Sequence, residues 1–132
     1  MRIPDIAFRI REDRNGAIDT TTALFVQLKN AVVDLRKNDG GTEASLTTAT
    51  QTTTNGTYYV VEVKWVGSLI RVWVNEVLLI SYNLLGSDLK YTEYPRVGVR
   101  LTKGGSPGTA ARVREFYAFD LYPMVEVTAR RQ

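Results

Sequence analysis

A strict alternation of apolar and polar side chains in the middle of the chain constrains its fold more than any other feature. Val61, Val63 and Trp65 alternate there with Glu62 and Lys64. Successive side chains of a β-strand point to opposite faces, so this pattern predicts a strand with one face turned to a core. A helix would need apolar residues three or four positions apart instead.

Two short turns divide this region into three strands. Gly67-Ser68 interrupts the alternation, and glycine supplies the positive φ that a two-residue hairpin loop needs. Asn75-Glu76 marks a second turn, because asparagine tolerates the left-handed region better than most residues. The sequence therefore predicts an antiparallel three-stranded meander over Tyr59–Tyr82.

Similar alternation predicts strands on both sides of this meander. Near the N-terminus, Ile6, Phe8 and Ile10 are expected to share one apolar face. A helical turn is also indicated over Leu84–Tyr91, but it is short and is expected to contribute little to the fold. The other predicted strands are Leu24–Leu28, Val33–Leu35, Val97–Leu101, Arg112–Tyr122 with a bulge near Glu115-Phe116, and a short last strand at Val125–Val127.

Roughly seven to nine short strands separated by Gly and Asn turns are typical of an antiparallel sandwich or barrel. No helical segments alternate with them, which argues against a parallel α/β sheet. We therefore predict an all-β fold, an antiparallel β-sandwich of jelly-roll type. The chain has 132 residues, about one domain, and we expect a single domain over 1–132, weakest at 1–5 and 123–132.

The residue types needed for most catalytic sites are missing. The chain has no Cys and no His, which excludes disulfides, thiolate and imidazole metal ligands, and nucleophilic sites that use His. Glycoside hydrolysis needs two carboxylates held about 5–10 Å apart. The acidic residues are scattered one per strand or turn, although a pair from different strands stays open. We predict no enzyme activity and no cofactor.

Charge and hydropathy predict neither a nucleic-acid partner nor a membrane span. The net charge of +3 lies in residues 56–132, because residues 1–55 hold seven basic and seven acidic side chains. The basic residues are spread out, without the cluster of Lys and Arg interleaved with aromatics that is typical of nucleic-acid binders. No apolar stretch is long enough to cross a bilayer. The first ten residues carry charges and lack the apolar core of a signal peptide, so we expect no signal peptide.

Two loops offer oxygen ligands of the type that Ca²⁺ prefers, at Asp13 with Asn15 and at Asn38 with Asp39. Both lie beside glycine in turns, where Asp and Asn side chains usually accept hydrogen bonds from nearby backbone amides. We favour the turn interpretation and predict no metal site.

Aromatic side chains are the candidate ligand contacts. Trp65 shares the apolar face of its strand and is expected in the core. Trp73 is out of phase with Val72 and Val74, and is expected to point outward beside Arg71. The loop residues Tyr91 and Tyr94 would either line a groove or plug the end of the sandwich. The predicted ligand-binding residues are Arg71, Trp73, Tyr91 and Tyr94.

The segment 42–57 contains eight threonines. Threonine favours strands, and its hydroxyl makes a polar sheet surface. We predict one exposed edge strand followed by a loop. The alternative is a surface that faces a glycan or a protein.

The stretch TYYVVEVKWVGSLIRVWVNEVLL, together with RVGV at 96–99 and FYAFD at 116–120, resembles the laminin-G-like branch of the concanavalin A-like lectin/glucanase superfamily. The likeness covers roughly residues 58–121, with Ile6–Leu35 a weaker match. Two features depart from that family: Glu76 replaces the glycine usual after the turn Asn, and the chain is short, so a strand could come from another chain. The paired acids of the hydrolase members are absent.

The resemblance implies a fold and a binding or scaffolding role, as in similar modules of phage tails and capsid surfaces. Our leading hypothesis is a non-enzymatic, lectin-like structural or adhesion module of a phage virion. Its partners would be other virion proteins or further copies of itself. The alternatives are a carbohydrate-binding module that uses Trp73, and a small glycoside-active enzyme. Without a virion setting, we expect a cytoplasmic location.

Overall fold

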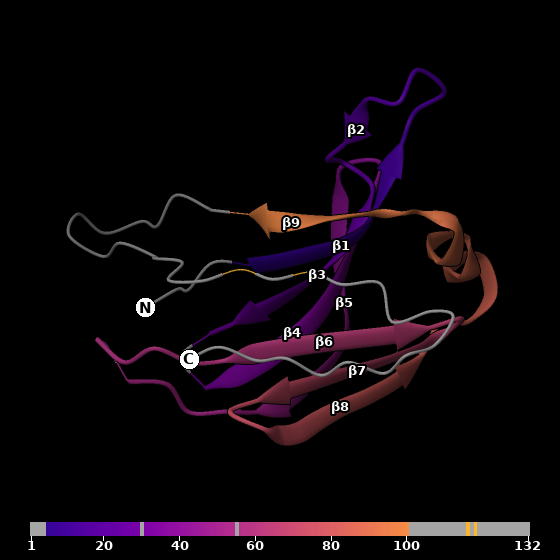
Figure 1. Ribbon diagram of the computed structural model, residues 1–132. Coiled ribbons are helices and arrows are strands. Elements are labelled where there is room, and N and C mark those ends of the chain that lie inside the picture. Colours follow the sequence, from indigo (N-terminus) through magenta and orange to yellow (C-terminus); the bar gives the residue numbers. More distant parts are fainter. Residues whose placement is uncertain (1–4, 30, 55, 101–115, 117, 119–132) are drawn as a thin grey trace.

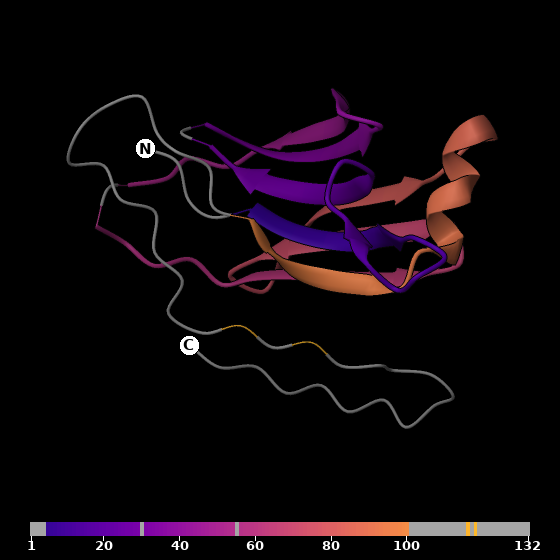
Figure 2. The ribbon, with the colours of Figure 1, turned by 90° about the horizontal axis from the view of Figure 1, so that it is seen from above.

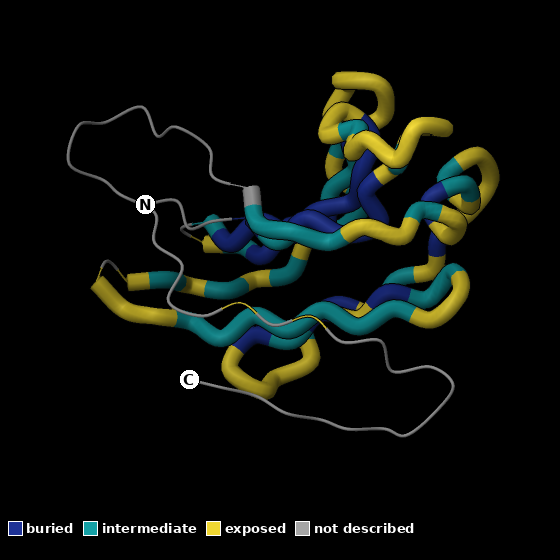
Figure 3. Tube along the Cα trace, turned by 45° about the horizontal axis from the view of Figure 1, so that its top comes forward, coloured by how far each residue is buried: buried dark blue, intermediate teal, exposed yellow. Residues whose placement is uncertain are grey.

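The computed structural model describes residues 5–29, 31–54, 56–100, 116 and 118, and it has two layers of antiparallel strands (Figures 1 and 3). Nine strands and one 3₁₀ helix follow one another in these ranges. They are β1 Asp5–Glu12, β2 Ile18–Asp19, β3 Ala23–Leu28, β4 Val32–Asp39, β5 Thr42–Thr50, β6 Val61–Val66, β7 Leu69–Val74, β8 Val77–Asn83, η1 Gly86–Glu93 and β9 Arg96–Arg100. The predicted all-β sandwich is confirmed, whereas its jelly-roll type stays a prediction.

The larger sheet has the strand order β9-β1-β3-β4-β5, and the short β2 pairs with the end of β1. Every pairing in it is antiparallel. Viewed from above, this sheet lies over the β6–β8 layer (Figure 2). The chain therefore builds most of one layer before it starts the second.

The smaller sheet is the predicted meander. Its order is β6-β7-β8, and Gly67-Ser68 forms the two-residue turn between Val66 and Leu69. Gly67 has φ +57°, as this turn requires. The second predicted turn also has the left-handed geometry, with φ +47° at Asn75 and +70° at Glu76.

The main core lies between the two sheets. Phe8 of β1 and the predicted core residue Trp65 of β6 pack together with ring centroids 4.8 Å apart. Its buried members come from both layers and from the segment after β8, and they are Phe8, Leu24, Val26, Leu28, Val33, Leu35, Ile70, Val72, Val74, Ile80, Leu84 and Tyr91. Burial of this apolar surface supplies the main force that holds the layers together.

A bulge in β1 corrects one sequence prediction. Phe8 belongs to the main core, but Ile10 joins a separate cluster with Ala7 and Phe25, on the opposite face of the sheet. The pairing of β1 with β9 shifts between Ala7 and Ile10, and Arg9 has φ +47°. This extra residue breaks the alternation, so Phe8 and Ile10 do not share a face.

The threonine-rich segment is an edge strand, as predicted. Among the described strands, β5 pairs only with β4. A register shift opposite Leu35 and Arg36 leaves one residue of β5 without a direct partner, and Leu46 packs against the main core there. Exposed positions alternate with half-buried ones along much of β5.

The helical segment was expected to contribute little, and this expectation is wrong. Gly86–Glu93 forms an eight-residue 3₁₀ helix, η1, that leads from β8 in one sheet to β9 in the other. Its Tyr91 is fully buried in the main core. The segment therefore closes one end of the sandwich.

Some predictions lie outside the described residues. These are the strands Arg112–Tyr122 and Val125–Val127, most of the FYAFD stretch, and residues 1–4 of the predicted weak N-terminus. No helix in the described part of the chain is long and apolar enough to cross a membrane.

The turn after β7 generates a stability prediction. A side chain with a Cβ in the left-handed region costs roughly 1–2 kcal/mol relative to the right-handed region, and glycine avoids this cost. We expect Glu76→Gly to be more stable than Glu76→Ala by about 1 kcal/mol in urea unfolding. The alanine variant is the matched control, because both changes remove the carboxylate. Equal stability of the two variants would show that Glu76 is not strained.

Candidate binding surface

The solvent-facing side of the smaller sheet carries two of the predicted site residues. The two-residue turn sets β6 and β7 in register, so directly opposed residues share a face. The same rule extends the face to β8. We call this surface the β6–β8 outer face, and its nine residues are Glu62, Lys64, Val66, Leu69, Arg71, Trp73, Leu78, Ser81 and Asn83.

Trp73 points outward, as predicted. Its neighbours along β7, Val72 and Val74, are buried in the core, whereas Trp73 is half-buried. Glu62 lies opposite Trp73 on β6, and Leu78 lies opposite it on β8. Leu78 is 48% exposed, which makes it an apolar neighbour of the indole in contact with solvent.

Two cations lie beside this tryptophan. Lys64 and Arg71 are direct cross-strand partners, so both side chains leave the same face of the sheet. The Lys64 ammonium nitrogen lies 5.2 Å from the centroid of the Trp73 ring, in a cation–π contact. Arg71 is exposed. Neither cation forms an ion pair with a carboxylate in the described ranges.

Tyr91 and Tyr94 lie at the end of the sandwich rather than on this face. Tyr91 is 0% exposed and its hydroxyl donates a hydrogen bond to the Asn38 carbonyl oxygen at 2.8 Å. Tyr94 is half-buried and packs edge-on against the Tyr91 ring, with centroids 5.7 Å apart. This geometry matches the alternative that the tyrosines plug the sandwich, and it leaves Tyr91 out of reach of a ligand at the surface.

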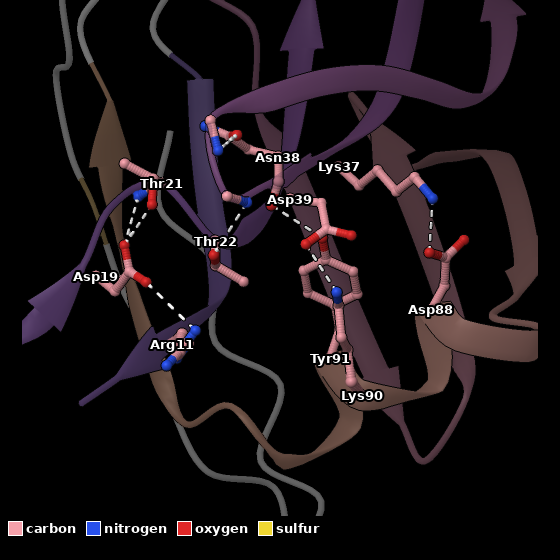
Figure 4. A network of polar contacts seen from close by, with 12 residues as sticks. Arg11, Asp19, Thr21, Thr22, Lys37, Asn38, Asp39, Asp88, Lys90 and Tyr91 are labelled. Atoms are coloured by element: carbon pink, nitrogen blue, oxygen red, sulfur yellow. Dashed lines mark hydrogen bonds and ion pairs between the residues drawn. The ribbon is translucent and has the colours of Figure 1, made fainter. Parts of the chain in front are cut away.

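Two ion pairs flank the buried tyrosine (Figure 4). Lys37 Nζ lies 2.7 Å from Asp88 Oδ1, and Lys90 Nζ lies 2.7 Å from Asp39 Oδ1. In each pair, one partner comes from the end of β4 and the other from η1. We call these contacts the η1 cluster, and its residues are Lys37, Asn38, Asp39, Asp88, Lys90 and Tyr91.

The environment of Tyr91 disfavours its ionisation. Burial raises the pKa of Tyr91 well above its ordinary value, and the negative charges of Asp39 and Asp88 raise it further. The phenol therefore remains a hydrogen-bond donor to Asn38 at any physiological pH.

Two acids on the larger sheet form the kind of pair from different strands that the sequence left open. Gln27 of β3 donates to Asp5 Oδ2 of β1 at 3.1 Å, and its cross-strand partner on β4 is Asp34. Asp5 and Asp34 therefore flank Gln27 on one face, two strands apart, which corresponds to about 9–10 Å between the strands. Both residues are buried, at 0% and 3% exposure.

Asp34 is held as a carboxylate by its neighbours. Burial by itself raises its pKa, but hydrogen bonds from Ser45, Lys29 and Arg36 outweigh burial and lower the pKa of Asp34 below its ordinary value. The three donor–acceptor distances are 2.6, 3.0 and 3.0 Å. A carboxyl in this state accepts hydrogen bonds and does not donate a proton near neutral pH.

The two candidate calcium loops have the predicted turn hydrogen bonds. Asp13 Oδ1 accepts from the amides of Asn15 and Ala17, at 2.8 and 2.9 Å. Asn38 Oδ1 accepts from the amide of Gly41 at 3.0 Å. Within the described residues there is also no group of three or more acidic side chains that could hold a metal ion.

Of the nine residues of this face, only Arg71 and Trp73 were predicted site residues, and two of the others, Lys64 and Leu78, lie beside Trp73. Lys64 was treated only as the polar partner of a core strand, and Leu78 only as part of a third strand. The signal for Lys64 was present, because a two-residue turn at Gly67-Ser68 pairs residue 64 with residue 71. Leu78 could not be assigned, because the pairing of β7 with β8 shifts between Val72 and Trp73.

The η1 cluster generates a prediction on stability and pH. Tyr91→Phe leaves the Asn38 carbonyl without its donor, which we expect to cost about 1 kcal/mol of unfolding free energy at neutral pH. In the wild type, the unfolded chain releases the Tyr91 proton above pH about 10 while the folded chain keeps it, so stability falls as pH rises beyond that point.

Urea unfolding between neutral pH and pH about 11 would test both effects. The alkaline loss of stability should be shallower in Tyr91→Phe than in wild type. Tyr58→Phe, at an exposed tyrosine, is the control and should follow the wild type. A Tyr91→Phe curve that overlaps the wild type throughout would contradict the role of this hydroxyl.

Comparisons with known proteins add no relative for this chain. No protein-family model, no curated protein and no solved structure matches it. The resemblance to the concanavalin A-like superfamily therefore stays a prediction from the sequence. The all-β sandwich rests on the strand pairings described above.

Proposed function

We propose that this chain is a non-enzymatic, lectin-like binding module that serves as a structural or adhesion component of a phage virion, at the tail or the capsid surface. It binds neighbouring proteins through the β6–β8 outer face. The binding role is supported by the outward Trp73, which lies beside the exposed Leu78 on this face. The virion setting is supported by the sequence resemblance alone.

The composition of this face supports a protein partner. Trp73 and Arg71 belong to the residue types that are enriched in protein interfaces and contribute most of the binding energy there. Val66, at the end of β6, is 77% exposed and extends the apolar area toward the first turn. The solvated face of an antiparallel sheet usually carries polar side chains, whereas four of the nine residues on this face are large and apolar.

The buried acids support a non-enzymatic role. A glycoside hydrolase needs one carboxyl that donates a proton and a second that acts as nucleophile or base, both open to the substrate. Asp5 and Asp34 are buried, and Asp34 is fixed as a carboxylate by three donors. These two acids stabilise the sheet rather than meet a substrate.

Site-specific crosslinking in the assembled particle would test the proposal. A photo-reactive phenylalanine analogue at position 78 should form one dominant adduct with a stoichiometric component of the same particle. The same analogue at position 14, in an exposed turn away from the face, is the control and should give none. No adduct from position 78, or the same unselective pattern from both positions, would count against this interface.

A second candidate is a carbohydrate-binding module, favoured by the outward position of Trp73 beside Arg71. Indole rings stack on sugar rings, and a cation beside the ring would bind sugar hydroxyls or acids. On a glycan array, this function predicts selective binding that Trp73→Ala removes. Tyr58→Ala, at another exposed aromatic, should leave binding intact. An array without hits, or hits that survive Trp73→Ala, would eliminate this candidate.

A further inference from the structure

Two like charges occupy directly opposed positions at the centre of the β6–β8 outer face. Lys64 and Arg71 are cross-strand partners, and such partners have Cβ atoms about 4.5–5.5 Å apart. Like charges in this arrangement destabilise a sheet. A solvated surface gains nothing from placing them together, so the pair suggests that something else offsets the repulsion.

The described part of the chain does not provide the compensating charge. Its ion pairs involve neither Lys64 nor Arg71. The single acid of the face is Glu62, one row away, opposite Trp73. Directly opposed residues of β6, β7 and β8 form a row across the sheet. In the row of Lys64 and Arg71, the third residue is the exposed Ser81, which carries no charge.

We infer that the partner of the β6–β8 outer face is an acidic protein segment, whose carboxylates are bound by Lys64 and Arg71 while its apolar side chains cover Trp73 and Leu78. This inference rests on the proposed function and adds the chemistry of the partner. Arg71 presents a planar fork that binds a carboxylate through two hydrogen bonds, and Ser81 beside it can donate a third.

The geometry favours a protein over an acidic glycan. Sugar binding would use the flat face of the indole, but the Lys64 ammonium already lies over that ring, 5.2 Å from its centroid. The apolar positions next to the cations are aliphatic as well as aromatic. Leu78 lies in the row on one side, and Leu69 and Val66 lie in the row on the other. A peptide that alternates acidic and apolar side chains matches these rows.

Fluorescence anisotropy with labelled peptides would test the inference on the purified chain. The probes are three short peptides of equal length that alternate Leu with Glu, Ser or Lys. We expect the Glu peptide to bind best and its affinity to fall with rising salt. Arg71→Ala should weaken it about two- to fivefold, and the double variant Lys64→Ala with Arg71→Ala about tenfold.

Two controls separate this site from general attraction. Arg14→Ala removes the same charge from an exposed turn elsewhere, and should leave the Glu peptide bound as in wild type. Lys64→Glu combined with Arg71→Glu should reverse the preference toward the Lys peptide. The fold of each variant is checked by its urea midpoint.

Several results would overturn the inference. The Glu peptide could bind no better than the Ser peptide, or Arg14→Ala could weaken binding as much as Arg71→Ala. Stronger binding of polygalacturonate, with the same dependence on Arg71, would assign the cations to an acidic glycan instead. If the crosslink from position 78 persists while charge changes have no effect, the proposed interface stands and only its acidic partner is wrong.

Discussion

The burial of Tyr91 in the main core, with its hydroxyl bonded to the Asn38 carbonyl, is the constraint that fixes the closed end of the sandwich. This hydrogen bond joins η1 to the end of β4, and η1 is the segment that carries the chain from the smaller sheet back to the larger one. An exposed ion pair contributes little by itself, typically below about 1 kcal/mol. Of the two pairs in the η1 cluster, Lys90–Asp39 is exposed and Lys37–Asp88 is partly buried, and both flank Tyr91, the single buried side chain of η1.

Contacts between neighbouring strands can be predicted from this sequence, whereas the contact of Tyr91 with Asn38 cannot. The meander follows from alternation and from one two-residue turn, and the register of Lys64 against Arg71 follows from that turn by counting. The contact of Tyr91 with Asn38 joins residues 53 positions apart. No pattern in either segment specifies the other, so η1 looked like a short turn of little consequence.

Bulges set the second limit of prediction. Each adds one residue to a strand and exchanges the two faces beyond it, without a clear mark in the sequence. Ile10 was assigned to the wrong face because of the bulge at Arg9, and Leu78 could not be placed because of the shift in β8. Trp73 and Trp65 lie on strands that are regular up to their positions, and both were placed correctly.

The polar side chains differ in where they bond. Some form hydrogen bonds within the chain, and others lie on its surface. Asp34 is surrounded by three donors, and Tyr91 donates to a backbone carbonyl. Their bonding capacity is used within the chain. Lys64 and Arg71 lie on the outer face of β6 and β7, and neither forms an ion pair within the described residues.

The bulge in β5 has a consequence for the behaviour of the chain at high concentration. From Ala44 to Thr54 the edge strand and its loop contain no charged residue and no proline, so the usual protections against edge-to-edge pairing are missing. The extra residue at Leu46 turns a side chain into the core and interrupts the straight ladder that a second strand would need. The bulge at Leu46 therefore opposes edge-to-edge pairing of two chains, which charge and proline do not prevent in this segment. A substitution that removed the bulge would favour ordered aggregation.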